Sequence, residues 1–357
     1  MKKICFLTLN NFLLSGCTRV TTDLANALSE FFDVSILSFC GNQEKENYFV
    51  NRNVYIYDFG KPYDFRARES VLLAKKLISF LKNKKIDVLI SSGSFALPLL
   101  ALIKPFIKCK IIFWDHENIE GRDWKSILFR KIGCKICDKT VVLTEKTLRD
   151  YKRIVGVSDD KIFQIYNFVN EEPCDGECDI YSKKIISVGR VSPEKGYEMA
   201  VRVAKDVFSK HPDWCWDIYG DGTDFEKIKL QIKHSGLENN MFLKGSTSRV
   251  REKYKDYAIC VLTSYREGFA MVLVEAKINK LPLVSFDCVA GPSEIISDGV
   301  DGFLIPCYNK SLMAEKICEL IENLELRKSF FECSQNNIFK FQKDKVINNW
   351  REIIECS

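Results

Sequence analysis

The chain has 357 residues, of which 46% are hydrophobic, and a formal net charge of +5. This length and apolar content allow two domains of ordinary size, each with its own core, and exclude a disordered chain. The charge is mild for the length and no nucleic-acid-binding module is recognisable, so we expect no nucleic-acid partner.

The basic residues are unevenly distributed along the chain. Residues 101–152 contain twelve Lys or Arg and seven Asp or Glu, which accounts for the whole positive excess. A basic face in this half suits an anionic membrane surface or a phosphate-bearing partner. An ordinary solvated face explains the excess equally well, and the sequence leaves both interpretations open.

The 15 cysteines are scattered over the chain, and their number is odd. A secreted disulfide-rich protein would be shorter and its cysteines more regularly spaced. We therefore expect reduced, mostly buried thiols and a cytoplasmic protein. Two cysteine pairs, Cys134/Cys137 and Cys174/Cys178, have spacings compatible with zinc, but the chain has only three histidines and no supporting cluster, so we predict no metal.

The N-terminus imitates a signal peptide. Lys2 and Lys3 lead into an apolar run, but Asn10 and Asn11 interrupt it and no clean cleavage site follows, so we predict a buried first strand instead. The most apolar later segment, residues 94–103, is too short to span a bilayer. We expect a protein that is soluble or peripheral, at the cytoplasmic face of a membrane in the second case.

Short apolar runs alternate with amphipathic segments of helical length in the first half. Helical periodicity predicts helices at residues 19–31 and 68–84. The apolar runs predict strands at residues 4–9, 33–39, 54–59, 87–92, 109–115 and 139–144. This alternation is typical of parallel strands joined by crossover helices.

A polar segment without periodicity follows, and the pattern then restarts. We predict a linker at residues 169–182 and strands at residues 184–189, 214–220, 241–245, 258–263 and 281–286. The sequence therefore predicts an α/β protein with two Rossmann-like domains, residues 1–168 and 183–335, that face each other across a cleft. The final segment, 336–357, predicts an amphipathic helix, and whether it packs back on the first domain stays open.

Two glutamates lie around the start of a predicted apolar helix. Glu267 precedes the helix, and Glu275 lies two turns inside it, roughly 12 Å along the axis. The first amides of a helix lack internal partners and carry a partial positive charge, so they form a site for a diphosphate. Gly268 lets a ligand approach this backbone closely. The residues expected to line the site here are Gly268, Phe269, Ala270, Met271 and Val272.

The spacing of the two glutamates suits a nucleotide sugar laid across this helix start. One carboxylate can accept hydroxyls of the donor sugar and the other can accept hydroxyls of the ribose, without a metal. A chance combination of one surface glutamate and one helix glutamate explains the spacing alone equally well.

A second candidate group follows the predicted strand 184–189. Arg190 and Lys195 lie on a loop at its carboxyl end, where ligands of open α/β sheets bind. Their cations can hold the same diphosphate and stabilise the charge that develops on it as the glycosidic bond breaks. Two ordinary loop charges are the alternative.

The first half contributes two further candidates. His116 comes directly after a predicted strand and can donate to a sugar hydroxyl or a phosphate, or orient an acceptor; a structural role is the alternative. Gly16 precedes a helix, in a second loop whose amides suit an anion.

Five motifs together resemble the retaining glycosyltransferase family 4, which has the GT-B fold: EGFAMVLVEA, SVGRVSPEKG, SGCTRV, WDHEN and GPSEIISDGVDGFLI. The resemblance implies that Glu267 contacts the donor sugar and that Glu275 binds the nucleotide ribose. It also implies an acceptor-binding first domain and a second domain that binds the nucleotide sugar.

The same resemblance implies roles for the remaining candidates. Arg190 and Lys195 correspond to the residues that bind the diphosphate, His116 to a histidine that contacts the donor sugar, and Gly16 to a glycine beside the donor phosphates and the acceptor. With Glu267, the first three of these residues make up the expected catalytic set.

The motifs also depart from the family pattern. Ser15 replaces a glycine of the first loop, and Ala270 replaces the last glycine of the usual EGFG. NKLP replaces the usual CGLP, so Asn279 or Lys280 must end the helix without glycine, and asparagine tolerates a left-handed cap. No departure removes a charged candidate, but the changed first loop leaves the acceptor open.

The resemblance implies the transfer of a hexose or N-acetylhexosamine from a UDP-sugar to a hydroxyl of a glycan acceptor, with retention and without a metal or other cofactor. The implied setting is surface polysaccharide biosynthesis, such as lipopolysaccharide O-antigen or capsule. We expect a polyprenyl-linked acceptor, an inner-membrane surface as a further partner, and a front-face displacement in which the leaving phosphate oxygen takes the acceptor's proton.

Two alternatives remain. A nucleotide-sugar epimerase of the same architecture would need acid–base groups around C2 of the sugar, and the sequence shows no such cluster. A non-catalytic, nucleotide-binding partner of a polysaccharide assembly complex would not need the charged motif residues, all of which are present.

Overall fold

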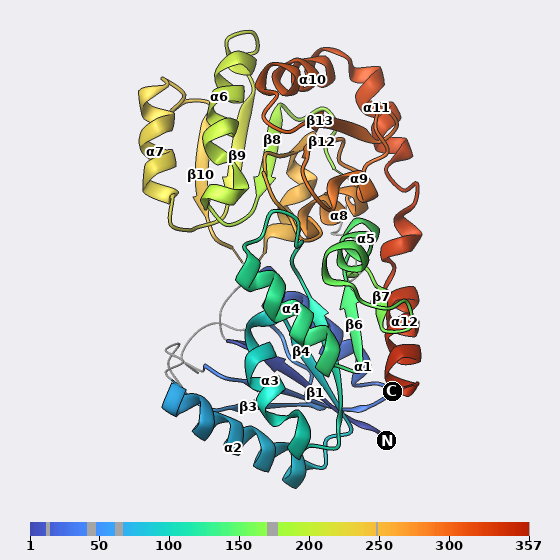
Figure 1. Cartoon of the computed structure of the whole chain (residues 1–357). Helices are drawn as coiled ribbons and strands as arrows, with labels where there is room; N and C mark the ends of the chain where they lie inside the picture. The colour runs from blue at the N-terminus through green and yellow to red at the C-terminus, as the bar shows by residue number, and fades with distance from the viewer. Residues whose placement is uncertain (12–14, 41–47, 61–66, 170–177, 248, 357) are drawn as a thin grey trace. The chain divides into compact units, whose positions relative to one another are not determined.

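The computed structural model describes residues 1–11, 15–40, 48–60, 67–169, 178–247 and 249–356 (Figure 1). The chain divides into two compact units, the first formed by Met1–Phe168 with Lys343–Ser357 and the second by Val169–Gln342. Each unit is built around one parallel sheet with helices beside it. The predicted α/β class with two Rossmann-like domains is confirmed.

In the described part of the first unit, seven parallel strands have the order β3-β2-β1-β4-β5-β6-β7. The inner strands β1, β2, β4 and β5 are almost wholly buried, because helices cover both faces of a parallel sheet, which is why they read as continuous apolar runs. The strands are β1 (Lys3–Thr8), β2 (Asp33–Ser38), β3 (Val54–Asp58), β4 (Val88–Ser92), β5 (Lys110–Asp115), β6 (Lys139–Val142) and β7 (Ile162–Gln164).

The helices of this unit are α1 (Gly16–Leu28), α2 (Ala67–Lys84), α3 (Leu97–Ile103), α4 (Trp124–Ile136), α5 (Glu145–Asp150) and α12 (Lys343–Glu355). Shorter helical turns are η1 (Ser94–Ala96), η2 (Lys104–Phe106) and the π-helical η3 (Tyr151–Val155). Helix α1 begins before the predicted start at residue 19, because the Ser15 side chain caps it by accepting from the Thr18 amide at 3.1 Å.

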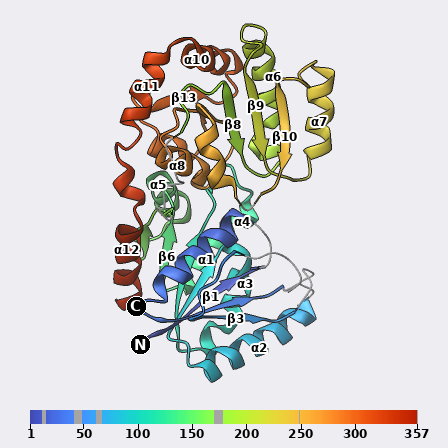
Figure 2. The ribbon, with the colours of Figure 1, turned by 180° about the vertical axis from the view of Figure 1, so that it is seen from behind.

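The C-terminal helix α12 belongs to the first unit and lies beside α1 (Figure 2). Its apolar face is buried, and the Trp350 ring packs on that of Trp114 with centroids 5.1 Å apart. Lys2 Nζ donates to Ile354 O at 3.0 Å, which brings the two chain ends together. The predicted amphipathic segment 336–357 is thus divided, since residues 336–342 belong to the second unit.

In the described part of the second unit, six parallel strands have the order β10-β9-β8-β11-β12-β13. They are β8 (Lys184–Val188), β9 (Cys215–Tyr219), β10 (Met241–Gly245), β11 (Ile259–Leu262), β12 (Leu283–Asp287) and β13 (Gly302–Pro306). The helices are α6 (Tyr197–Phe208), α7 (Phe225–His234), α8 (Met271–Ile278), α9 (Pro292–Ile295), α10 (Lys310–Glu322) and α11 (Leu324–Cys333). Helical turns are η4 (Pro193–Lys195), η5 (Val250–Asp256) and η6 (Ile338–Phe341).

The segment expected to be a linker lies partly outside the described residues, at 170–177. Its described end contacts the second unit: the Asp179 amide donates to Lys255 O at 2.8 Å, and Ser182 Oγ donates to Asp256 O at 2.8 Å. No helix among the described residues is long and apolar enough to cross a bilayer.

Candidate active site

Two motifs of the second unit are joined at the carboxyl ends of the neighbouring strands β8 and β11. Gly196 has φ of 65°, and a Cβ added there would lie 2.1 Å from Thr263 O, so only glycine allows this approach. Thr263 Oγ1 donates to Lys195 O at 3.0 Å, and the Tyr265 amide donates to Glu194 O at 2.9 Å. The SPEKG loop is therefore fastened to the segment that carries Glu267.

This contact places Lys195 beside Glu267. Lys195 Nζ lies 2.6 Å from Glu267 Oε1, and the two side chains are 21% and 9% exposed. A pair so far withdrawn from water interacts more strongly than a surface pair. The neighbouring Tyr197 hydroxyl has a raised pKa, first because it is buried and then because of the Glu267 charge, and it donates to Gly189 O at 3.3 Å. Arg190 lies on the same loop and is exposed.

Helix α8 begins at Met271, four residues after Glu267. Ala270, its N-cap, has φ of 61° and ψ of 55°, a left-handed conformation that glycine adopts without steric cost. Gly291 of the GPSE motif also has positive φ, and a Cβ there would lie 2.7 Å from Phe269 O. Met271 and Val272 are half-buried, and their amides belong to the first turn, which has no internal acceptors.

Glu275 lies inside α8 with 2% exposure. Its Oε2 accepts from the Tyr254 hydroxyl at 3.1 Å. Lys277, two residues after Glu275, anchors the helix. Its Nζ donates to Asp301 Oδ2 at 2.6 Å and to Ile295 O at 2.8 Å. Burial lowers the pKa of Lys277, and Asp301 opposes that effect. The anchor fixes the rotation of α8 and so the direction of Glu275.

The end of α8 decides between the two residues that the sequence left open. The residue with left-handed backbone is Lys280, with φ of 61°, whereas Asn279 has φ of −84°. Asn279 instead uses its side chain, because Nδ2 donates to the Glu275 carbonyl at 2.8 Å. The same carbonyl also accepts from the Asn279 backbone amide at 3.2 Å, so the side chain adds a second hydrogen bond to the last turn.

In the first unit, His116 lies at the carboxyl end of β5, within a small polar cluster. Its Nε2 is 2.9 Å from Ser92 Oγ, at the end of the adjacent strand β4. Ser92 Oγ also lies 2.7 Å from Thr21 Oγ1 and 3.6 Å from Cys17 Sγ. Thr21 and Cys17 are on α1, whose first residue is the exposed Gly16. Gly16 and His116 therefore flank one cluster.

Within this cluster, His116 and Cys17 shift the pKa of each other. Burial lowers the pKa of His116, but Cys17 and the carboxylates Asp115 and Glu117 together outweigh burial and raise it above its usual value. Burial likewise raises the pKa of the Cys17 thiol, but His116 and the hydrogen bonds to it lower the pKa overall. Each of the two groups therefore shifts the pKa of the other in the direction of its charged form.

The residue before His116 is held rigidly. Asp115 Oδ2 accepts from Arg130 Nε at 2.6 Å and from the Tyr151 hydroxyl, and all three side chains are buried. Arg130 Nη2 also lies 2.8 Å from Glu117 Oε2. This network on both sides of His116 fixes the turn that follows β5.

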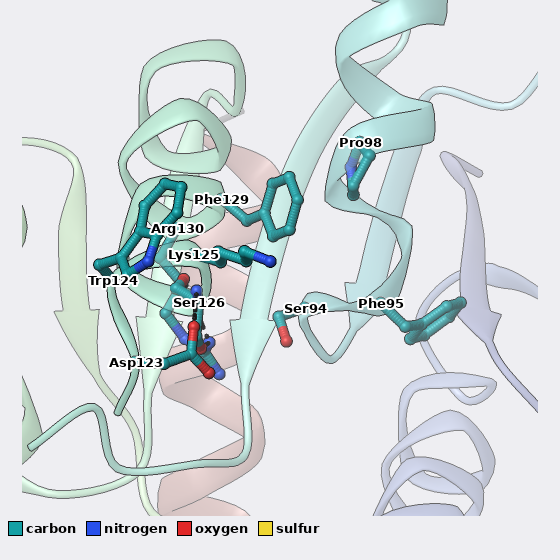
Figure 3. Close-up of a pocket in the computed structure, with 9 residues that line it drawn as sticks. All are labelled: Ser94, Phe95, Pro98, Asp123, Trp124, Lys125, Ser126, Phe129 and Arg130. Carbon is teal, nitrogen blue, oxygen red and sulfur yellow. Dashed lines mark hydrogen bonds between the residues drawn. The ribbon is translucent and has the colours of Figure 1, made fainter. Parts of the chain in front are cut away.

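A pocket of about 600 Å³ lies near this edge of the first sheet (Figure 3). One side comes from η1 and the start of α3, which follow β4, and the other from α4, which follows β5. The lining is mixed, with apolar rings, one lysine, one arginine and one carboxylate. The lining residues are Ser94, Phe95, Pro98, Asp123, Trp124, Lys125, Ser126, Phe129 and Arg130.

The predicted site residues thus fall into two groups. The second unit holds Arg190, Lys195, Glu267, Glu275 and the start of α8, with Lys195 and Glu267 in direct contact, and the first unit holds Gly16 and His116. Sequence reasoning missed Ser92 and Tyr254, which contact two of these residues; the position of Ser92 at a strand's carboxyl end was an available signal. The described residues contain no group of three or more potential metal ligands.

Comparison with known proteins decides the family. A family model described as "Glycosyl transferases group 1" matches residues 180–336, and one described as "Glycosyltransferase Family 4" matches residues 14–173. An uncharacterized glycosyltransferase of Haemophilus influenzae is 30% identical over 99% of this chain and 100% of its own length. The chain belongs to the GT-B glycosyltransferases.

Two further relatives of this glycosyltransferase act in polysaccharide biosynthesis. The amylovoran biosynthesis glycosyltransferase AmsD of Erwinia amylovora is 28% identical over 95% of each chain. The poly(ribitol-phosphate) alpha-N-acetylglucosaminyltransferase of Staphylococcus aureus is 31% identical over 77% of this chain and 56% of its own length. The structure of HepE from Anabaena with UDP and glucose shares the fold, with a TM-score of 0.83 over the full length of both chains and 16% identity.

Proposed function

We propose that this glycosyltransferase moves a hexose or N-acetylhexosamine from a UDP-sugar to a hydroxyl of a glycan acceptor, with retention of the anomeric configuration. The observation that carries the proposal is the contact between Lys195 and Glu267, 2.6 Å apart next to the start of α8. It supports the proposal because it holds a cation and a carboxylate together at the carboxyl ends of two neighbouring strands, where the cation would bind the diphosphate and the carboxylate the sugar hydroxyls.

The leaving diphosphate would be stabilised by the chain's own groups. Lys195, the exposed Arg190 and the first-turn amides of α8 all supply positive charge at the carboxyl ends of β8 and β11. Such fixed donors gain strength as charge develops on the leaving phosphate, so they lower the barrier more than they stabilise bound substrate. A transfer without a metal is the mechanism these groups support.

The same contact argues against a covalent double displacement, so the retention proposed above would follow a front-face route. Lys195 neutralises the Glu267 carboxylate, and a paired carboxylate is a poor nucleophile for a covalent sugar intermediate. In the proposed step the bond from C1 to the phosphate oxygen breaks, and the acceptor oxygen bonds to C1 on the same face. The acceptor's proton passes to the departing phosphate oxygen.

Glu275 is the proposed ribose ligand. Its bond to Tyr254 shows that it accepts a hydroxyl in its present orientation, and the two ribose hydroxyls would join or replace that of Tyr254. The UDP and glucose in the fold-related HepE structure and the N-acetylglucosaminyl transfer named for the S. aureus relative support a UDP-sugar donor.

We further propose a lipid-linked acceptor of surface polysaccharide assembly. Support comes from the mixed pocket at the carboxyl edge of the first sheet, whose rings suit an apolar chain and whose Lys125 suits a phosphate. His116 and Ser92 lie at the same edge and would orient the donor sugar or the acceptor hydroxyl. The amylovoran relative supports the setting.

Donor binding and turnover test the proposal together. We expect thermal stabilisation by UDP and by one UDP-sugar, little by GDP or ADP, and its loss in Glu275→Ala. The anomeric configuration of the product, read by NMR, should match that of the donor, and EDTA should leave the rate unchanged. An inverted product, a glycosyl adduct on Glu267, or metal-dependent turnover would each overturn the corresponding part. Donor binding without any turnover would favour the non-catalytic partner.

A further inference from the structure

Helix α4 exposes an unusual amount of apolar surface. Trp124, Leu128, Phe129 and Ile132 are 68%, 44%, 44% and 38% exposed. Trp124, Leu128 and Ile132 follow one another at four-residue intervals, so they form one stripe along the helix. The opposite face, with Gly133 and Cys134, is the buried one. The stripe therefore contributes nothing to the core of the first unit.

The same helix is basic on its solvent side. Lys125, Lys131 and Lys135 are exposed, and residues Trp124–Ile136 include no Asp or Glu. The fourth cation, Arg130, is buried and already paired with Asp115 and Glu117.

The carboxylates nearest along the chain do not neutralise these lysines. Asp123 caps the helix by accepting from the Ser126 amide at 2.8 Å, Glu117 pairs with Arg122 at 3.1 Å as well as with Arg130, and Glu120 pairs with Lys146. The outer face of α4 thus combines large apolar side chains with uncompensated positive charge.

The neighbouring segment also exposes apolar side chains. Helix α3 packs closely on α4, since a Cβ at Gly133 would lie 2.7 Å from Leu97 Cδ1. Near its end, α3 exposes Leu102, at 56%, and the chain that follows exposes Phe106, at 62%, and Lys108. By contrast, α7 of the second unit exposes one large apolar residue, Leu230.

We propose that the outer face of α4 docks on an anionic lipid surface, with the helix lying in the plane of the interface. Large apolar side chains including a tryptophan, lysines interspersed among them and no acid are the composition of helices that lie in the interface of a bilayer. The lysine stems can cover apolar surface while their ammonium groups reach the headgroups. A second copy of this chain would bring the same lysines against each other, so the charge favours lipid over self-association.

Docking in this way would place the pocket beside the membrane. Trp124, Lys125 and Phe129 belong to α4 and also line the pocket (Figure 3). An amphiphilic acceptor could then enter the pocket without leaving the lipid surface. The docking itself does not depend on which sugar is transferred, and it is measured without donor or acceptor.

Tryptophan fluorescence gives a direct reading of this surface. The chain has five tryptophans, and Trp114, Trp214, Trp216 and Trp350 are each at most 5% exposed. A blue shift on adding phosphatidylglycerol-containing vesicles, and quenching by brominated lipid, would therefore report Trp124. We expect both with anionic vesicles at low salt, neither with pure phosphatidylcholine, and no shift in Trp124→Phe.

Co-sedimentation with the same vesicles tests the charges. Each lysine near an anionic surface strengthens binding by roughly fivefold, so Lys131→Glu/Lys135→Glu should weaken it by more than about tenfold. The matched control, Lys229→Glu/Lys233→Glu on α7, makes the same change in net charge and should bind as the wild type does. Leu128→Glu should weaken binding, and Leu230→Glu should not.

Three results would overturn the proposal: no binding to anionic vesicles, equal loss in the α4 and α7 variants, or binding without a Trp124 signal. Concentration-dependent self-association that shifts Trp124 fluorescence without lipid would assign the face to a second copy instead. Thermal stabilisation by UDP in the α4 variants would show that the donor site is intact, so failure of docking and failure of the proposed transferase function remain distinguishable.

Discussion

Lys195 Nζ and Glu267 Oε1 lie 2.6 Å apart, although 72 residues separate the two along the chain. Each follows a different strand, β8 and β11, and these strands are neighbours in the sheet. The adjacency of two strand ends therefore converts two distant motifs into one charged pair. Five predictions follow from this and related contacts.

Removal of the Lys195 ammonium should abolish most turnover. We expect Lys195→Met to lower kcat by roughly 10²- to 10³-fold, the size typical of losing one donor to a developing anion. Lys183 is a matched control, because it immediately precedes β8 at its other end and pairs with Asp213 on the surface. Lys183→Met should retain wild-type kcat. Equal rates in both variants would remove Lys195 from the mechanism.

Gly196→Ala should damage both stability and activity, because its Cβ would lie 2.1 Å from Thr263 O at positive φ. Gly236→Ala separates the cost of the positive φ from the cost of the steric contact. Gly236 also has a positive φ, of 67°, but nothing lies within 4 Å of an added Cβ. We expect Gly236→Ala to cost about 1 kcal/mol, the left-handed backbone penalty alone, and Gly196→Ala to cost more. Chemical denaturation measures both, and equal costs would contradict the role of the Thr263 contact.

Glycine should be tolerated, or should increase stability, at two residues that have a left-handed backbone. Ala270 and Lys280 have φ of 61° at the two ends of α8, where glycine avoids the steric cost. We expect Ala270→Gly and Lys280→Gly each to be neutral or to stabilise the protein by up to about 1 kcal/mol. Ala276→Gly, inside the same helix, should destabilise it by about 1 kcal/mol. The opposite signs test the backbone assignment in one denaturation series.

The buried ion pair between Lys277 of α8 and Asp301 should contribute strongly to the free energy of unfolding. Lys277→Met leaves the Asp301 carboxylate buried without its cation, which costs about 3–5 kcal/mol. The double variant Lys277→Met/Asp301→Leu should recover part of that loss, because no unpaired charge remains. Urea unfolding of the two variants measures the difference. A double variant less stable than Lys277→Met would show that the Asp301 contacts to the backbone matter more than its charge.

Cys17 should react as an activated thiol. Its pKa is lowered by His116 against the opposing effect of burial, so the alkylation rate should reach half its maximum at a lower pH than for an ordinary thiol. A synthetic peptide with a single cysteine, added to the same reaction, serves as the reference thiol. His116→Gln should move the Cys17 midpoint upward. Peptide mass spectrometry after iodoacetamide treatment measures the alkylation of Cys17 and of the reference thiol. An unchanged Cys17 midpoint in His116→Gln would contradict the effect of His116 on the Cys17 thiol.

Much of the fold could be predicted because the determinants are local. The inner strands are continuous apolar runs, and their burial on two faces demands this composition whatever the rest of the chain does. The edge strands β7 and β13 were missed: β7 is three residues long, and β13 begins at Gly302 and ends at Pro306, so neither shows a periodic pattern. The start of α1 was misplaced because its cap depends on the Ser15 side chain.

The sequence by itself determined two parallel α/β domains, the candidate charges at the strand ends and the family. It could do so because strand burial, helix periodicity and glycine at positive φ constrain residues close together in the chain. Only the tertiary structure decided that Lys195 meets Glu267, that Tyr254 holds Glu275 and that Cys17 and His116 share Ser92. Each of these contacts joins residues from different strands or helices, and their meeting depends on strand order and on helix packing, which no local pattern encodes.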